Sequence, residues 1–584
     1  MTSLVARSTP CNPRHADPRP PRRNDVVHLD GDTKRALEIG RTRLLLAAAL
    51  FAVAFSVVGM RLIGVTLLQE GGEPSLADVP QQTMRTERAD IIDRNGVLLA
   101  TNLETASLYA NPRQVLDAEE AARRIVEVLP EVDHADLVAR LSSDRSFIWI
   151  KRNLTPRQQY EVNRLGIPGL HFQKEERRVY PQGALTAHVV GFSDIDNRGL
   201  AGIELSFNDV LRGGQEPLQL SLDLRIQHIL HEELSQAITD FDGIGGAGIV
   251  LDTRTGEVLA MVSLPDFDPN APGSATADAR FNRATLGLYE MGSTFKIFNT
   301  AMALESGTAR LDSTYDASKP IRIGGFTIHD FHGEDRRLTV PEVFIYSSNI
   351  GSAKMAEEVG PQAQKAFMKR LGMLRAAGIE LPEVGEPMYP APWRPINMMT
   401  ISYGHGIAVS PLHVVSAVSA MVNGGVMRPA TLIERAPHEV SVGDRVISAD
   451  TSAIMRRLLR LVVEEGTGSF AKAPGYLVGG KTGTAEKLSG GNYNKNARVA
   501  SFVGAFPMND PRYVVLAMID EPKPNATSYG YATGGWVAAP AVGRLVQRMA
   551  TLVGMPPVDE KQEADPQGDL LIAVNATDQT HAAE

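Results

Sequence analysis

The sequence of 584 residues has a single cysteine, Cys11, and no excess of positive charge, since 59 lysines and arginines stand against 68 aspartates and glutamates. One cysteine cannot form an internal disulfide, and it says little about compartment, because a large protein outside the cytoplasm can lack cysteine altogether. The net charge of -9 argues against a nucleic-acid partner, which usually leaves a basic footprint. With 43% hydrophobic and 22% charged residues, the chain resembles neither a disordered nor a polytopic membrane protein.

Two further absences concern the fold and cofactors. The sequence has no internal repeats, and its histidines do not stand at the spacing of a metal site. A chain of 584 residues is nevertheless too long for one hydrophobic core. We therefore expect two or three folded units of ordinary globular type.

One long apolar segment lies near the amino terminus. Residues 44–60 carry no charge, and after Arg61 the apolar character continues to residue 68. A helix of roughly 20 such residues crosses a bilayer. The segment is preceded by basic residues and followed by acidic ones, namely Arg7, Arg14, Arg19, Arg22, Arg23, Lys34, Arg35, Arg41 and Arg43 before it and Glu70, Glu73 and Asp78 after it. The positive-inside tendency predicts a cytoplasmic amino terminus, with everything after residue 70 outside.

Two other interpretations of this segment compete with a membrane anchor. A cleaved signal peptide normally has a shorter basic region, a shorter apolar core and a cleavage site of small residues. A buried core helix would not be expected to have this length and such clean charge edges. We therefore predict a single-pass anchor at 44–68.

Composition divides the rest of the chain into four parts. Residues 1–43, rich in Pro, Arg and Asp, predict a disordered cytoplasmic tail, and residues 556–584 predict a disordered acidic tail. Residues 69–220 predict a mixed α+β unit without an evident catalytic cluster. In this unit the turn Asn95-Gly96 predicts a hairpin, and residues 118–129 and 155–166 predict helices.

Residues 221–555 form the second predicted unit. It begins with an amphipathic helix that has Asp223 near its start, followed by strand, turn and strand around Thr255-Gly256. Three more strands are predicted within 476–487, 499–508 and 512–520, and a closing helix over 540–553. Between the two groups of strands, about 200 residues read mostly as helix and loop. The sequence thus predicts an α+β fold, in which an antiparallel five-stranded sheet is flanked by helices and interrupted by an all-α insertion.

Ser293 and Lys296 are the first candidates for chemistry. Residues three apart on a helix share a face, so the lysine amine can approach the serine hydroxyl. The segment after Gly292 is apolar almost all round, which predicts a buried helix. Burial lowers the pKa of a lysine toward a value useful for a base. Taken alone, the pair is also compatible with a capping serine and a snorkelling lysine.

Ser347 and Asn349 supply a hydroxyl and an amide two residues apart, on a predicted loop between helices. A hydroxyl can relay a proton, and an amide can hold a substrate carbonyl or the lysine. A helix cap or an Asx-turn would use the same residue types.

The third candidate is the run Lys481, Thr482, Gly483 and Thr484 on a predicted strand. Glycine weakens a strand unless another group must approach its backbone closely. A cation and two hydroxyls beside such an open edge suit an anionic group of a substrate. By itself, this run is also compatible with an exposed strand that carries lysine and threonine.

Together, S-x-x-K, S-x-N and K-T-G in this order are the signature of penicillin-binding proteins and serine β-lactamases. The chain resembles a class B penicillin-binding protein, a peptidoglycan transpeptidase, over nearly its whole length beyond the tail. The resemblance also rests on the anchor and on residues 88–100, 178–192, 199–204, 250–270 and 462–487. Residues 346–351, 402–412 and 531–540 resemble the division type more than the elongation type. The family often has Gly where Ala89 stands and Pro where Met291 stands, which affects only local turns.

The resemblance implies a mechanism. Ser293 attacks the penultimate D-Ala carbonyl of a stem peptide with neutral Lys296 as base, Ser347 relays a proton to the leaving D-Ala, and Asn349 positions the substrate amide and Lys296. It further implies that the terminal carboxylate, or that of a β-lactam, binds Lys481, Thr482 and Thr484 beside Gly483. The N–H groups of Ser293 and Thr484 are expected to form the oxyanion hole. No metal or other cofactor is implied.

The resemblance also implies partners: peptidoglycan stem peptides, β-lactams, the lipid bilayer, a polytopic membrane glycosyltransferase and other proteins of the division machinery. It places the enzyme on the cytoplasmic (inner) membrane, with the catalytic unit on the outer side and residues 69–220 as a non-catalytic pedestal of dimerisation type. Three alternatives stay open. They are a carboxypeptidase or β-lactamase in which water resolves the ester, a non-enzymatic envelope scaffold, and an enzyme of elongation.

Overall fold

The computed structural model of this protein describes residues 31–63, 88–489 and 492–558. The chain forms two compact units, one ending at Arg85 and the other beginning at Thr86, and each is described by itself. The predicted acidic tail and the predicted tail before Gly31 lie almost wholly outside the described residues.

The first unit contains one long helix, α1 (Gly31–Ile63). Its segment Arg41–Met60 is long and apolar enough to cross a membrane, judged by length and composition. Residues 64–68 of the predicted anchor lie outside the described part. The helix starts before residue 44, where a disordered tail was predicted as far as 43. No proline lies between Pro21 and the end of α1, and residues that favour a helix follow from Lys34. The helix can therefore extend toward the amino terminus.

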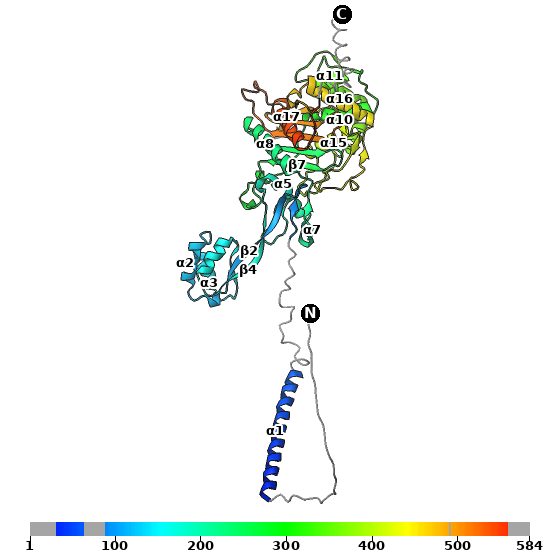
Figure 1. The fold of residues 1–584 in the computed structure, drawn as a ribbon. Coiled ribbons are helices and arrows are strands. Elements are labelled where there is room, and N and C mark those ends of the chain that lie inside the picture. The colour runs from blue at the N-terminus through cyan, green and yellow to red at the C-terminus, as the bar shows by residue number, and fades with distance from the viewer. Residues whose placement is uncertain (1–30, 64–87, 490–491, 559–584) are drawn as a thin grey trace, which may run out of the picture. The chain divides into compact units, whose positions relative to one another are not determined.

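The second unit starts with a mixed sheet in the order β3 (Ile148–Leu154), β2 (Leu98–Ala110), β1 (Ile91–Ile92) and β5 (Leu218–Gln219), with β4 (Leu170–Val179) paired to β2. The predicted turn Asn95-Gly96 joins β1 to β2, and Gly96 has a φ of +80°. Helices α2 (Ala118–Val128), α3 (His134–Leu141) and α4 (Pro156–Arg164) complete a small lobe at the end of β2 and β4 (Figure 1). Two of these helices, α2 and α4, were predicted from the sequence.

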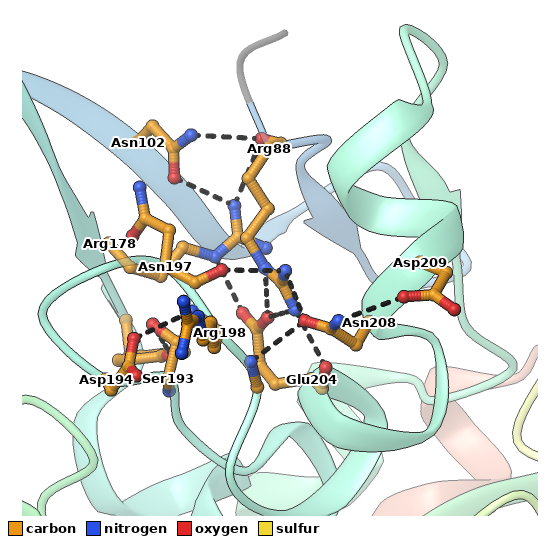
Figure 2. A network of polar contacts seen from close by, with 12 residues as sticks. Arg88, Asn102, Arg178, Ser193, Asp194, Asn197, Arg198, Glu204, Asn208 and Asp209 are labelled. Carbon is orange, nitrogen blue, oxygen red and sulfur yellow. Dashed lines mark hydrogen bonds and ion pairs between the residues drawn. The ribbon is translucent and has the colours of Figure 1, made fainter. Parts of the chain in front are cut away.

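A buried ionic network ties this region together (Figure 2). The side chain of Glu204 is fully buried and accepts hydrogen bonds from Arg88 Nε and Arg178 Nε, each at 2.6 Å. The Arg88 guanidinium also donates to the backbone oxygen of Glu204 at 2.7 Å and to Asn208 Oδ1 at 3.1 Å. Arg178 reaches back to Asn102 Oδ1 at 3.2 Å. Glu204 therefore joins three parts of this region, namely its start at Arg88, strand β4 at Arg178, and helix α6 (Gly202–Ser206).

The rest of this unit contains the predicted five-stranded antiparallel sheet. Its order is β14 (Gly479–Ser489), β15 (Asn492–Phe506), β16 (Tyr513–Asp520), β6 (Gly245–Asp252) and β7 (Val258–Leu264). Alternate residues of β16 point to two different cores. Val515 and Ile519 belong to the core that contains residues of α8 (Leu224–Asp240) and α17 (Gly534–Leu552), whereas Leu516 and Met518 belong to the core that contains residues of α15 (Pro411–Val422) and α16 (Ala449–Glu465). The strand β14 forms one edge of the sheet.

The insertion between β7 and β14 is mainly helical, as predicted. Its main helices besides α15 and α16 are α10 (Lys296–Glu305), α11 (Val340–Ile345), α12 (Asn349–Val359), α13 (Pro361–Arg370) and α14 (Pro395–Ile401). It differs from an all-α insertion by three short two-stranded sheets. One of them pairs β9 (Ile321–Ile323) with β10 (Phe326–Ile328), and another includes β11 (Arg337–Thr339). Helix α17 begins at Gly534 and contains Pro540, which was predicted to be its first residue.

The buried network predicts the effect of Glu204→Gln. An amide cannot accept two charged donors on both sides as a carboxylate does, and it leaves two buried guanidinium groups uncompensated. We expect the free energy of unfolding of the region that contains β1–β5 to fall by about 3 to 5 kcal/mol. The measurement is urea unfolding of the full chain, with hydrogen exchange of β2 and β4 as the local readout. Glu104→Gln, an exposed change on β2, is the control. Equal stability of the two variants would show that the network stabilises nothing.

Candidate active site

Ser293 lies on a tight turn that leads into a buried helix. The turn Gly292–Phe295 is a 3-10 helix, and α10 starts at Lys296. Ser293 and Lys296 were predicted to share one α-helical face. In a 3-10 turn, residues i and i+3 are eclipsed, which brings the two side chains closer still. The Lys296 Nζ donates to Ser293 Oγ at 3.0 Å.

Close backbone packing fixes this turn. Gly292 has a φ of +54°, and a Cβ at this position would lie 2.4 Å from the Thr484 carbonyl oxygen. From the other side, a Cβ on Gly404 would lie 2.1 Å from the Gly292 carbonyl oxygen. The turn that carries Ser293 is therefore held between strand β14 and the loop after α14, with no space for side chains at either contact.

Lys296 is 1% exposed and makes several polar contacts. Besides Ser293, its amine donates to Asn349 Oδ1 at 2.7 Å, to Ser347 Oγ at 3.1 Å and to the Ser347 carbonyl oxygen. Burial and the neighbouring Lys481 hold the pKa of Lys296 well below its usual value, and the carboxylate of Asp330 opposes them. The structure thus places a lysine of lowered pKa within hydrogen-bond distance of a serine hydroxyl.

Ser347 and Asn349 lie at the junction of α11 and α12, where a loop between helices was predicted. Ser347 has a φ of +60°, a left-handed conformation that is uncommon for serine. This conformation directs both its hydroxyl and its carbonyl oxygen to Lys296. Asn349 is the first residue of α12 and turns its amide oxygen to the same amine. Both residues therefore contact the lysine, which is more than a local cap or Asx-turn would require.

Lys481 reaches the same place from the edge strand β14. Its side chain is fully buried, and its amine donates to Ser347 Oγ at 2.9 Å. Burial lowers the pKa of Lys481 to about 7. The hydroxyl of Ser347 is therefore shared by two buried amines from different parts of the fold.

The residues after Lys481 line the same strand. The Thr482 and Thr467 hydroxyls are 2.9 Å apart, and the N–H of Gly534 at the start of α17 donates to Thr484 Oγ1 at 3.0 Å. A Cβ on Gly483 would lie 2.5 Å from the Met291 carbonyl oxygen. This contact explains the glycine within the strand, because the turn that carries Ser293 lies directly against it.

The arrangement supports a specific chemistry. Two amines that contact the same hydroxyl away from water repel each other when both are charged. The favoured state therefore has one charged amine and one neutral amine. The neutral amine can take the proton of Ser293, while the charged amine and the threonine hydroxyls can bind an anionic group. Among the described residues, no group of three or more His, Cys, Asp or Glu side chains could hold a metal ion.

Two residues around the site were not predicted from the sequence. Thr467 contacts Thr482, and Asp330 binds the start of α12 at Ser348 and Asn349. Both lie on loops outside the three motifs. Thr467 belongs to the stretch 462–487 noted for its resemblance, whereas no pattern marked Asp330.

Comparisons with known proteins agree on the family. The penicillin binding protein transpeptidase domain matches residues 246–547, and the penicillin-binding protein dimerisation domain matches residues 83–229. The probable peptidoglycan D,D-transpeptidase FtsI of Caulobacter vibrioides is 41% identical over 529 residues, which cover 88% of this chain and 89% of that protein. The peptidoglycan D,D-transpeptidase FtsI of Escherichia coli is 28% identical and covers 87% and 90%.

Solved structures match as well. Penicillin binding protein 3 from Mycobacterium tuberculosis, complexed with aztreonam, has a TM-score of 0.63 and 26% identity. The match covers 81% of this chain and 97% of that chain. The same protein complexed with ampicillin has a TM-score of 0.64.

Proposed function

Because the chain belongs to the class B penicillin-binding proteins, we propose that it is a serine D,D-transpeptidase that cross-links the stem peptides of peptidoglycan. One observation carries the proposal. The side chains of Ser293, Lys296, Ser347, Asn349 and Lys481, from three separate segments, form one hydrogen-bonded cluster. That cluster contains the nucleophile, base and anion-binding group that acyl transfer needs.

In the first step, Ser293 Oγ attacks the carbonyl of the penultimate D-Ala, and its proton moves to neutral Lys296. The N–H groups of Ser293 and Thr484 stabilise the resulting oxyanion, an interaction whose loss typically costs about 3 to 4 kcal/mol. The close contact of Gly292 with the Thr484 backbone supports this assignment, because Ser293 directly follows Gly292 in the chain.

The tetrahedral intermediate then collapses. The C–N bond breaks, and the proton passes from Lys296 through the Ser347 hydroxyl to the amine of the leaving D-Ala. An ester on Ser293 remains. In the second half, an amine of a neighbouring stem peptide attacks this ester, its proton goes to Lys296, and Ser293 Oγ leaves with a proton from that lysine.

The charged partner in the cluster serves recognition. Lys481, with the hydroxyls of Thr482 and Thr484, binds the terminal carboxylate of the donor peptide, and Asn349 holds the peptide amide. The carboxylate of a β-lactam binds in the same place. A β-lactam therefore acylates Ser293 as well. No part of it departs in this step, so no room is made for the acceptor amine.

The proposed location of the protein in the cell follows from the predicted membrane anchor. The basic residues before the apolar segment 44–60 and the acidic residues after it favour a cytoplasmic amino terminus, with the catalytic unit on the outer side of the inner membrane. Residues 69–220 then act as a non-catalytic pedestal, residues 221–555 as the transpeptidase unit, and 1–43 and 556–584 as tails. A polytopic glycosyltransferase and other division proteins are the partners expected at the membrane.

The relatives favour a role in septum formation. Two of them are named FtsI, and one is 41% identical to this chain. We expect cells depleted of the protein to grow as filaments, since elongation continues without cross-linking at the septum. Rounded cells after depletion would assign the enzyme to elongation instead.

The proposal is tested by a cross-linking assay with the full chain in detergent, using lipid-linked glycan strands that carry stem peptides. We expect Ser293→Ala to lose all dimeric peptide product, because the nucleophile is gone. Ser274→Ala, on the exposed surface, keeps wild-type activity. A product made equally by Ser293→Ala would contradict a serine acyl-enzyme, and release of D-Ala without dimers would indicate a carboxypeptidase.

The two lysines predict a bell-shaped pH dependence of acylation by penicillin. The second-order rate constant reports the groups of the free enzyme. Lowering the pH through the depressed pKa of Lys296 protonates the base and slows the reaction. Raising the pH through the pKa of Lys481, near 7, removes the charge that binds the carboxylate. In Lys481→Arg the falling limb disappears, because a guanidinium stays charged. A falling limb that persists in this variant would exclude Lys481 as its cause.

A further inference from the structure

The inference concerns Asp330, on the loop between β10 and β11, outside the three motifs. Its carboxylate binds the beginning of α12 in three ways. Oδ1 accepts the backbone N–H of Asn349 at 2.5 Å and that of Ile350 at 3.0 Å, and Oδ2 accepts the Ser348 hydroxyl at 2.7 Å. A carboxylate suits this place, since a helix start offers free N–H groups and a partial positive charge.

These contacts complete the first turn of α12. The N-cap Ser348 accepts the N–H of Gly351 at 2.9 Å, while Asp330 takes the two N–H groups before it. The same loop receives the Asn349 side chain, whose Nδ2 donates to the His329 carbonyl oxygen at 3.1 Å. This bond leaves the amide oxygen of Asn349 facing Lys296 at 2.7 Å.

Ser347 depends on the same clamp. Its left-handed backbone conformation is strained and persists only where the surroundings hold it. Asp330 accepts hydrogen bonds from Ser348 and Asn349, the two residues that follow Ser347. The Ser347 hydroxyl is thereby kept between Lys296 and Lys481, at 3.1 and 2.9 Å.

Asp330 also contributes charge. Its carboxylate raises the pKa of Lys296, against burial and the repulsion of Lys481 on β14. Burial lowers the pKa of His405, on the loop after α14, and the charge of Lys296 lowers it further. Ser293, Ser347 and Asn349 complete the surroundings of the amine and are uncharged.

We propose that Asp330 is a positioning residue for acylation, which holds Ser347 and Asn349 against Lys296 and acts on that amine through its negative charge. This inference rests on the proposed function. Asp330 touches no reacting atom, and it acts through the backbone of Ser348 and Asn349 and through its field.

The test compares full-length Asp330→Asn with wild type by the rate of labelling with fluorescent penicillin, from about pH 5 to about pH 9. Asparagine keeps an oxygen for the N–H groups but loses the charge and the acceptor for Ser348. We expect the plateau rate to fall about 10- to 100-fold, as misplacement of a catalytic group does. The acid limb should move to lower pH by about half a unit to one unit, because Lys296 loses a stabilising charge.

Asp335→Asn is the matched control, since it removes the same charge from an exposed position of the same loop. It should behave as wild type. An acid limb of Asp330→Asn that stays at the wild-type position overturns the proposal, whether or not the plateau falls, because a merely structural residue would lower the rate equally at every pH. An unchanged plateau overturns it as well.

Asp330→Glu covers the case in which Asp330→Asn does not fold. The charge stays, but the longer side chain cannot keep all three short contacts. We expect an acid limb at the wild-type pH and a plateau lower by about tenfold or more; a wild-type plateau overturns the proposal. Absence of labelling in the wild type and in Asp335→Asn would instead contradict the proposed function itself.

Discussion

Two buried lysine amines that share one serine hydroxyl are the interaction on which the rest of this structure depends. Lys296 and Lys481 both donate to Ser347 Oγ, and both side chains are almost completely inaccessible to solvent. Such a pair is expensive unless one amine gives up its proton. Burial thus favours one neutral and one charged amine, which are the two states that the proposed base and the proposed anion-binding group require.

The fold supplies the rigid walls that this arrangement needs. Lys296 comes from a helix within the core, Lys481 from the edge of a five-stranded sheet, and Ser347 from a junction of two helices in the insertion. Backbone contacts at Gly292, Gly404 and Gly483 hold the turn before Lys296 against β14 and the loop after α14, at distances that exclude any side chain. The strand β14 is an edge strand, which is where an extended peptide would add to the sheet in the proposed reaction.

Much of this could be predicted from the sequence. The five strands alternate or run apolar in clear segments, Asp223 caps α8 as expected, and the motif residues meet. The rest depends on contacts between distant segments. Asp330 and Thr467 act from loops without periodicity, and the start of α17 before Pro540 is fixed by packing of Gly534 against β14, which local propensity does not encode. The buried Glu204 network likewise joins residues that lie more than a hundred positions apart.

The most direct measurement is peptide mapping by mass spectrometry of the full chain after incubation with penicillin. The account predicts one adduct with the mass of the intact penicillin, on the peptide that contains Ser293, which persists because no acceptor amine resolves the ester. An adduct on any other residue, or rapid turnover of penicillin without an adduct, would contradict the acyl-enzyme at Ser293.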